Sequence, residues 1–245
     1  MKISIVIPAK NEKENLEPLI KEIHQAIFGL YDFEIVVVDD GSTDGTAQHL
    51  RHVQNTDNKH LHLIRLSQSV GQSTAIWTGV VQSSGNIIVT LDADGQNDPA
   101  DIPLLLTQAL LYPVGSDFCV TGYRTARKDT AWKRIQSKIA NTIRRTILGD
   151  NTPDTGCGLK VFPKSTLLSL PYFDHMHRFL PALIQQRGGT IRVVPVNHRG
   201  RLHGQSKYSM LGRLGVGIID IAGVLWLKKR NKLGDVIMES ETACK

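Results

Sequence analysis

Short apolar runs rich in valine and isoleucine alternate, in the first half of the chain, with segments whose apolar residues recur every three or four positions. The short runs are typical of buried parallel strands and lie at residues 3–7, 34–38, 61–66 and 86–91. The periodic segments predict amphipathic helices at residues 16–27 and 72–81, and Ser42 or Asp44 can cap a further helix after the second strand. This alternation predicts an α/β fold with a mostly parallel central sheet flanked by helices.

The second half of the chain has a less regular pattern. We expect an amphipathic helix, a loop, a short strand, a helix and a final strand, at residues 131–148, 150–158, 159–162, 171–186 and 191–197 respectively.

A last apolar run at residues 214–227 contains Asp220 and is followed by Lys228, Lys229 and Arg230. As a helix it would reach about 21 Å, short of the roughly 30 Å hydrocarbon core of a bilayer. We therefore expect an amphipathic or apolar helix at a membrane interface, with a buried helix of the soluble domain as the alternative.

Charge is distributed unevenly along the chain. Residues 1–123 hold 7 Lys and Arg against 15 Asp and Glu, whereas residues 124–213 hold 17 Lys and Arg against 4 Asp and no Glu. An acidic half suited to a divalent cation is thus followed by a basic half suited to an anionic partner, unless the basic residues only make the surface soluble. Nucleic acid is not the expected partner, because no helix-turn-helix, zinc or RNP pattern occurs and aromatic residues make up only 6%.

Cysteine usage and the first residues bear on the cellular compartment. The three cysteines form no Cys-x-x-Cys pair, and the first residues show no signal-peptide pattern. We expect a reducing, cytoplasmic environment without a disulfide framework or a zinc cage.

Two carboxylates, Asp92 and Asp94, follow the predicted strand at residues 86–91. Because residues i and i+2 of a strand share a face, we expect both side chains to meet one cation. Oxygen ligands favour Mg²⁺ or Mn²⁺, and Gln96 can supply a further oxygen. Such an ion would neutralise the charge that develops on a pyrophosphate leaving group. The alternative is an ordinary aspartate-rich turn.

A second polar cluster, DDGSTDGT at residues 39–46, follows another predicted strand. Its paired carboxylates, Asp39 and Asp40, can accept hydrogen bonds from a ribose hydroxyl or a base N–H. The chain lacks both the Gly-x-Gly-x-x-Gly fingerprint and a Gly-Lys-Ser/Thr phosphate loop, which disfavours NAD enzymes and P-loop kinases.

These clusters, together with IVIPAKNEKENL at residues 5–16, resemble the inverting family 2 glycosyltransferases, which have the GT-A fold. Three further motifs resemble the dolichol-phosphate mannosyltransferases and their bacterial polyprenyl-phosphate relatives within that family. They are GYR (residues 122–124), DTGCGLK (154–160) and RLHGQSKY (201–208). The resemblance covers nearly the whole chain.

The resemblance implies transfer of mannose, glucose or a related sugar from a GDP- or UDP-sugar to a dolichyl or undecaprenyl phosphate, with Mg²⁺ or Mn²⁺ as cofactor. The implied nucleoside contacts are Pro8, Glu12, Val38 and Asp40. The implied metal and sugar-diphosphate contacts are Asp92, Ala93, Asp94 and Gln96. Phosphate contacts and, with Asp94, the expected catalytic residues are Arg124, Arg201 and Lys207. Lys10 stands where the mannosyltransferases commonly have an aromatic residue, so this nucleotide contact leaves the donor base open.

The residue types of the basic half also bear on the acceptor. A hydroxyl must lose a proton to attack, whereas a phosphate monoester is already largely dianionic at neutral pH because its second pKa is about 6. Residues 124–213 lack glutamate and are rich in cations, which favours a phosphate acceptor, although Asp154 could serve as a base. A hydroxyl acceptor, a sugar nucleotidyltransferase and a non-catalytic polyanion-binding module remain as alternatives.

These inferences divide the chain into four parts. We expect a nucleotide-sugar-binding half at residues 1–123, an acceptor-binding half of the same domain at 124–210, a membrane-interface helix at 211–232 and a flexible tail at 233–245. The expected location is the cytoplasmic face of an anionic membrane, as a peripheral protein. The sequence does not indicate an oligomeric state.

Overall fold

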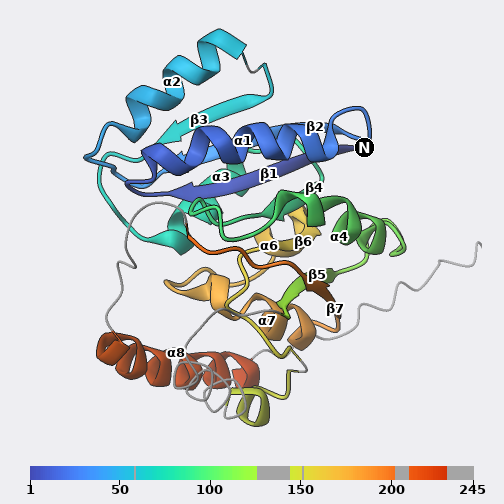
Figure 1. The fold of residues 1–245 in the computed structure, drawn as a ribbon. Coiled ribbons are helices and arrows are strands. Elements are labelled where there is room, and N and C mark those ends of the chain that lie inside the picture. Colours follow the sequence, from blue (N-terminus) through green and yellow to red (C-terminus); the bar gives the residue numbers. More distant parts are fainter. Residues whose placement is uncertain (58, 126–143, 151, 202–209, 231–245) are drawn as a thin grey trace, which may run out of the picture.

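A seven-stranded sheet forms the centre of the molecule in our computed structural model, which describes residues 1–57, 59–125, 144–150, 152–201 and 210–230 (Figure 1). The strand order is β3-β2-β1-β4-β6-β5-β7. Strand β6 is antiparallel to its neighbours β4 and β5, whereas the other pairs are parallel. The bounds are β1 (Lys2–Ala9), β2 (Asp32–Asp39), β3 (Leu61–Arg65), β4 (Ile87–Thr90), β5 (Phe118–Arg124), β6 (Lys160–Pro163) and β7 (Thr190–Val196).

Helices cover both faces of this sheet because side chains on each strand alternate between the faces. Ile5 and the other strand residues on its face of the sheet pack with α1, α2 and α4. Val6 and the other strand residues on the opposite face pack with α3, α7 and α8. The helices are α1 (Lys13–Ile27), α2 (Thr46–Asp57), α3 (Gln72–Gln82), α4 (Ile102–Ala109), α6 (Lys164–Leu168), α7 (Leu180–Gln186) and α8 (Met210–Arg230), with 3₁₀ turns η1 (Pro99–Asp101) and η2 (Met176–Arg178).

The predicted α/β fold is confirmed, with three differences in its elements. Strand β5 and helix α4 are present in the structure but were not predicted from the sequence. The helix predicted at residues 171–186 is wrong over its first half, where His175 has a left-handed φ of 65° and only α7 is α-helical. Phe173, Met176 and Phe179 pack in the core at a spacing of three, which imitates a helical period. Most of the helix predicted at residues 131–148 lies outside the described residues, although residues 144–148 are helical.

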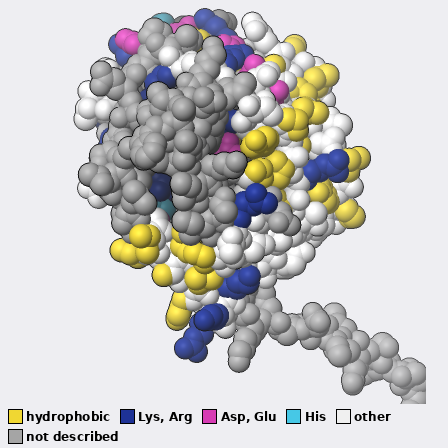
Figure 2. All heavy atoms as spheres, turned by 60° about the horizontal axis from the view of Figure 1, so that its bottom comes forward, with side chains coloured by type: hydrophobic (Ala, Val, Ile, Leu, Met, Phe, Trp, Pro, Cys, Tyr) yellow, Lys and Arg dark blue, Asp and Glu magenta, His cyan; other side chains and the backbone are white. Residues whose placement is uncertain are grey.

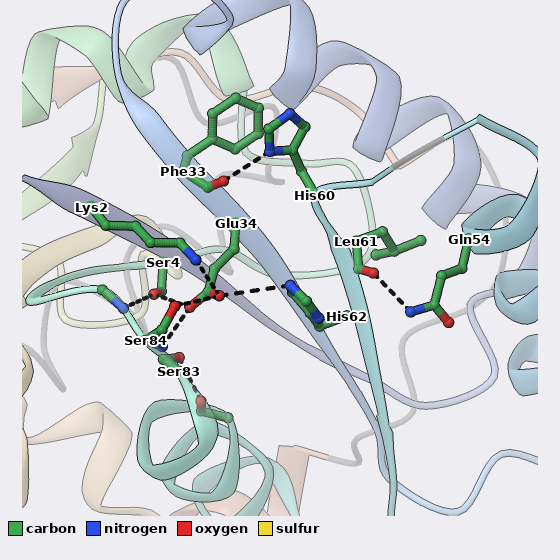
Figure 3. Close-up of polar contacts among 12 residues, drawn as sticks. Lys2, Ser4, Phe33, Glu34, Gln54, His60, Leu61, His62, Ser83 and Ser84 are labelled. Atoms are coloured by element: carbon green, nitrogen blue, oxygen red, sulfur yellow. Dashed lines mark hydrogen bonds and ion pairs between the residues drawn. The ribbon is translucent and has the colours of Figure 1, made fainter.

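At the amino end of the sheet, the buried carboxylate of Glu34 in β2 connects neighbouring segments, whose hydrogen-bond donors surround it (Figure 3). It accepts hydrogen bonds from Ser4 Oγ of β1 at 2.5 Å and from Ser84 N and Oγ at 2.6 and 2.8 Å. The ammonium of Lys2 lies 3.2 Å away. Burial alone raises the pKa of Glu34, but these hydrogen bonds outweigh burial and lower the pKa to about 2.

The opposite edge of the sheet collects the polar clusters of the sequence. Strands β1, β2, β4, β5 and β7 all end there, and the antiparallel strand β6 begins there. Crevices at the carboxyl edge of such sheets are the usual ligand sites. The fold therefore brings segments from both halves of the chain to one place.

Candidate active site

Asp92 and Asp94 lie in a turn rather than in a strand, because β4 already ends at Thr90. The reason given above for their convergence, the shared face of a strand, is therefore wrong. The turn is shaped by Gly95, whose φ is 71°, and by hydrogen bonds from Gln96 N to Asp94 Oδ1 and from Asp92 N to Asn97 Oδ1. A tight turn, and not the pleat of a strand, places the two carboxylates at the edge of the sheet.

Asp92 contacts both halves of the chain. Gln72, the first residue of α3, donates from Nε2 to Asp92 Oδ1 at 2.9 Å. Gly158, just before β6, lies so close that an added Cβ would meet Asp92 Oδ2 at 2.3 Å. Burial, and secondly the charge of Asp94, raises the pKa of Asp92 to about 6, and the nearby cations of Lys160 and Arg124 oppose this shift. The raised pKa marks a crowded anionic site.

A cavity of about 20 Å³, which has room for one water molecule, lies beside Asp92. Its lining joins Pro8 at the end of β1 with Gln72, Lys160 and His177. His177 is bonded through Nδ1 to Ser73 Oγ at 2.7 Å, and burial holds its pKa well below the usual range, so it is neutral. Asp92, a predicted metal ligand, and Pro8, a predicted nucleoside contact, thus line the same cavity.

Asp94 is paired with Arg201, whose Nη2 lies 2.6 Å from Asp94 Oδ2. Two contacts bring this arginine segment across the turn. Arg199 N donates to Gln96 O at 2.9 Å, and Asn97 forms an isolated β-bridge with His198. Residues more than 100 positions apart in the sequence thus meet, and the phosphate contact predicted for Arg201 stays a prediction. Lys207 lies outside the described residues.

Asp40 is buried and holds the loop that precedes α3. Its Oδ1 accepts from Val70 N at 2.7 Å, and its Oδ2 accepts from Gly71 N at 3.1 Å and Ser69 Oγ at 2.8 Å. Lys10, which directly follows β1, donates from Nζ to the same Ser69 Oγ at 2.9 Å. Lys10 and Asp40 therefore lie next to each other, connected by one hydroxyl.

The remaining predicted contacts differ in how their side chains are placed. Glu12 precedes α1 and accepts from Asn15 Nδ2 at 2.7 Å. The side chains of Val38 and Ala93 are packed in the core, at 0% and 5% exposure. Their predicted contacts to a ligand stay predictions, and those contacts would have to come from main-chain atoms.

Arg124 is the last residue of β5, and its guanidinium is held by Asp154 through two hydrogen bonds of 2.7 and 2.9 Å. Both side chains are largely buried, at 17% and 3% exposure. The predicted phosphate contact Arg124 is thus brought to the same edge as Asp92.

The donor atoms at this edge suit a hard divalent cation. Asp92 and Asp94 repel one another, and Asp94 already attracts the guanidinium of Arg201. Mg²⁺ and Mn²⁺ commonly use one or two carboxylates and complete their shell with water and substrate phosphates. No group of three or more His, Cys, Asp or Glu side chains within the described ranges is arranged to hold a metal ion. Two carboxylates with a half-buried Gln96 beside them fit the substrate-assisted arrangement.

Sequence reasoning missed several residues of this site, namely Gln72, Asn97, Gly158 and Lys160. Gln72 carries a weak signal, because the first residue of a helix that follows a parallel strand points toward the carboxyl edge. Gly158 and Lys160 stand in the DTGCGLK motif, but they are more than 60 residues away from Asp92 in the sequence. Only the fold brings them to the cavity beside Asp92. Pairing of that kind is visible only in the fold.

Both the sequence and the fold are similar to those of known proteins. A model described as "Glycosyl transferase family 2" matches residues 4–169. The dodecaprenyl-phosphate galacturonate synthase of Rhizobium johnstonii is 32% identical over 233 residues, which cover 94% of this chain and 68% of the relative. The undecaprenyl-phosphate 4-deoxy-4-formamido-L-arabinose transferase of Pseudomonas fluorescens is 35% identical over 210 residues, which cover 85% of this chain and 60% of the relative.

Solved structures with a similar fold include glucosyl-3-phosphoglycerate synthase from Mycobacterium tuberculosis. Its complex with Mn²⁺, UDP-glucose and phosphoglyceric acid has a TM-score of 0.65 at 20% identity, and its complex with Mg²⁺ and UDP has a TM-score of 0.65 at 21% identity. Both matches cover 93% of this chain and 79% of the solved chain. At this identity the likeness bears on the fold alone, and it confirms the expected GT-A fold.

Proposed function

This chain belongs to glycosyl transferase family 2, and from this premise we propose that it transfers a sugar from a nucleoside diphosphate sugar to the phosphate of a polyprenyl phosphate. The curated relatives are named as enzymes that act on dodecaprenyl and undecaprenyl phosphate. This chain spans only 60% to 68% of their length, so the acceptor is part of the proposal.

One observation carries the proposal: the carboxylates Asp92 and Asp94 lie at the same sheet edge as the guanidinium groups of Arg124 and Arg201. A reaction that joins two phosphate-bearing substrates needs a cation site for the leaving diphosphate and further cations for the incoming phosphate. The edge supplies both kinds of group within one site.

The carboxylates of the described acceptor half each lie beside an arginine or histidine side chain. Asp150 lies 3.0 Å from Arg144, Asp154 is bonded to Arg124, and the exposed Asp174 lies 3.6 Å from His175. A hydroxyl acceptor requires a base with capacity for a proton, whereas a dianionic phosphate requires none. This pattern supports a phosphate acceptor over an alcohol.

The hydrogen bonds of Asp40 favour uracil as the base of the donor. A carboxylate has about four lone-pair sites, and loop 69–71 occupies three of those on Asp40. The remaining site suits the single imide N–H of uracil better than the paired N–H groups of guanine. Lys10 beside it supplies a donor for a neighbouring carbonyl. We therefore propose a UDP-sugar.

Mg²⁺ or Mn²⁺ would be held by Asp92 and Asp94, with Gln96 beside them. When bound, such an ion supplies Lewis-acid stabilisation of the charge on the departing diphosphate. Arg201, now paired with Asp94, would be released to contact a phosphate once the carboxylate has another cation to balance.

The residues of this chain would direct a single displacement. Arg124, Arg201 and Lys207 would position the acceptor phosphate so that its oxygen attacks the anomeric carbon as the bond to the diphosphate breaks. No proton has to be removed from the attacking oxygen. A single displacement inverts the anomeric configuration.

Helix α8 would place the site at a membrane surface. Ile218, Ile219 and Trp226 are 66%, 73% and 60% exposed on one side of α8, whereas Val224 on the other side is fully buried in the core. Seen from this end of the molecule, hydrophobic side chains and Lys or Arg side chains occur close together (Figure 2). No helix in the described part of the chain has the length and apolarity to cross a bilayer. We propose a peripheral helix on an anionic cytoplasmic surface, as amphipathic helices bind.

The function is tested with purified protein, Mn²⁺, a panel of UDP- and GDP-sugars, and undecaprenyl phosphate in detergent. We expect a lipid phosphosugar with inverted configuration, release of UDP, and loss of both products in EDTA. Undecaprenol is the matched acceptor control and should remain unmodified. Release of inorganic pyrophosphate would identify a nucleotidyltransferase, and glycosylation of undecaprenol would identify a hydroxyl acceptor.

The donor base is tested separately by calorimetric titration of UDP and GDP in the presence of Mn²⁺. UDP should bind at least tenfold more tightly than GDP. Lys10→Ala should reduce this difference in affinity, because the variant binds UDP more weakly. Equal binding of the two nucleotides would contradict the assignment of uracil and leave the acceptor proposal unaffected.

A further inference from the structure

Asp154 holds Arg124 along one edge of its guanidinium. Nε donates to Oδ2 at 2.7 Å and Nη2 donates to Oδ1 at 2.9 Å, so both carboxylate oxygens are used in one two-bond pair. Such bidentate pairs fix the plane of the guanidinium as well as its position. Gly156 lies against the same group, since an added Cβ there would meet Nη2 at 3.0 Å.

The opposite edge of this guanidinium is left for another anion. Nη1 of Arg124 makes no hydrogen bond to any part of the protein that the structure describes. The charge of Arg124 acts on Asp92, which places the guanidinium within electrostatic reach of that carboxylate. A phosphate bound beside Asp92 would therefore lie within the field of the Arg124 guanidinium, which has Nη1 available to donate to it.

We propose that Asp154 is a positioning residue, which orients Arg124 toward the phosphate of a substrate, and is not the general base of the reaction. This inference rests on the proposed function. A carboxylate that acts as a base must offer a lone pair to the substrate proton, within direct reach of the attacking oxygen. Asp154 is 97% buried, and each of its oxygens accepts a hydrogen bond from the Arg124 side chain, so protonation would weaken the pair that orients the arginine.

Kinetics of Asp154→Asn distinguish the two roles. A positioning role predicts that KM for the phosphate-bearing substrates rises about tenfold, while the pH profile of kcat keeps its wild-type shape. A base predicts that kcat falls by about 100-fold or more and that the acidic limb of its pH profile disappears. The matched control is Asp150→Asn, because Asp150 is buried in the same loop but is paired with Arg144. This control variant should have a KM within about twofold of the wild-type value.

A double-mutant cycle provides the second measurement. If Asp154 acts only through Arg124, then Arg124→Gln combined with Asp154→Asn should be no worse than Arg124→Gln alone. Additive losses, or a changed kcat–pH profile, would overturn the proposal. Melting temperatures of all variants show whether a loss comes from unfolding.

A binding assay keeps this inference separate from the proposed function. Binding of UDP in the presence of Mn²⁺ can be measured without an acceptor. Asp154→Asn should weaken this binding about tenfold even if the acceptor proves to be an alcohol. Unchanged binding together with unchanged KM would reject the positioning role, whichever acceptor the wild-type enzyme uses.

Discussion

At the scale of single residues, the chemistry depends on contacts between positions far apart in the chain. Asp92 and Asp94 are recognisable from their spacing, but their contacts with Gln72, Gly158 and Arg201 are not. Each neighbour acts on one carboxylate: a hydrogen bond to Asp92, a steric limit on Asp92 and an ion pair with Asp94. The motif therefore indicates the two carboxylates proposed as metal ligands, whereas the fold identifies the residues that hold them.

Gly158→Ala is expected to displace Asp92, because the added methyl would lie 2.3 Å from its Oδ2. Removing the support of a metal ligand typically costs about 10- to 100-fold in metal affinity. We expect a loss of that size in the binding of Mn²⁺ with UDP, measured by calorimetry. Gly223→Ala is the control, since a Cβ there meets no atom within 4 Å. Equal affinities of the two variants would contradict this steric role.

Asp94→Asn is expected to lower the rate of sugar transfer by about 100-fold or more without unfolding the protein. The substitution removes a charge that both Arg201 and the cation require, whereas the half-buried side chain has no role in the apolar core. Product formation measures the loss and circular dichroism checks the fold. Activity within twofold of wild type would refute the metal assignment.

At the scale of elements, the buried strands are readable because a parallel strand covered on both faces is a continuous apolar run. Strands β1, β2 and β4 confirm this reading. Glu34 is the exception inside β2, and its surroundings explain it: donors from Lys2, Ser4 and Ser84 surround the carboxylate (Figure 3). The residue joins β2 to β1 and to the loop before β4.

Glu34→Gln is expected to destabilise the protein by roughly 2 to 3 kcal/mol at pH 7, since the pKa of Glu34 is lowered to about 2 and each unit corresponds to about 1.4 kcal/mol. The depressed pKa contributes stability that is complete above the unfolded pKa near 4.3 and is lost as pH falls toward 2. Urea unfolding at several pH values measures it. The difference between wild type and variant should shrink below about pH 4.

Glu17→Gln is the matched control, because Glu17 also has a lowered pKa but is paired with Lys21 on the surface. Surface pairs contribute little, so this variant should stay within about 0.5 kcal/mol of wild type. A Glu34→Gln variant as stable as this control at pH 7 would show that the buried cluster does not stabilise the sheet.

At the scale of the whole molecule, the site and helix α8 are connected through one loop. His175 Nδ1 lies 3.1 Å from Asp220 of α8, and the neighbouring Tyr172 and His177 contact Thr74 and Ser73 of α3. Asp220, which interrupts the apolar run of the sequence, thus faces the protein. The exposed apolar residues lie on the remaining surface of α8.

Replacing Ile219 and Trp226 together by Asp should reduce co-flotation with anionic liposomes at least tenfold, because it removes two exposed apolar side chains from the proposed membrane face. Leu111→Asp is the control: it changes an equally exposed apolar residue, 66% accessible, on the loop after α4. Flotation of the double variant at the wild-type level, or an equal loss in the control, would exclude α8 as the membrane contact.

The sequence by itself determined the α/β class, the polar clusters that follow the strands, and the family, because these features depend on local periodicity and on residues adjacent in the chain. Only the tertiary structure decided that Asp92 and Asp94 converge through a turn, that Asp40 holds a loop, and that Asp154 is committed to Arg124. The contacts of Asp40 and Asp154 join segments 30 residues apart, and the packing of the sheet and its helices rather than any local pattern sets such distances. The turn is local, but the end of β4 at Thr90, which decides between a turn and a strand, is visible only in the structure.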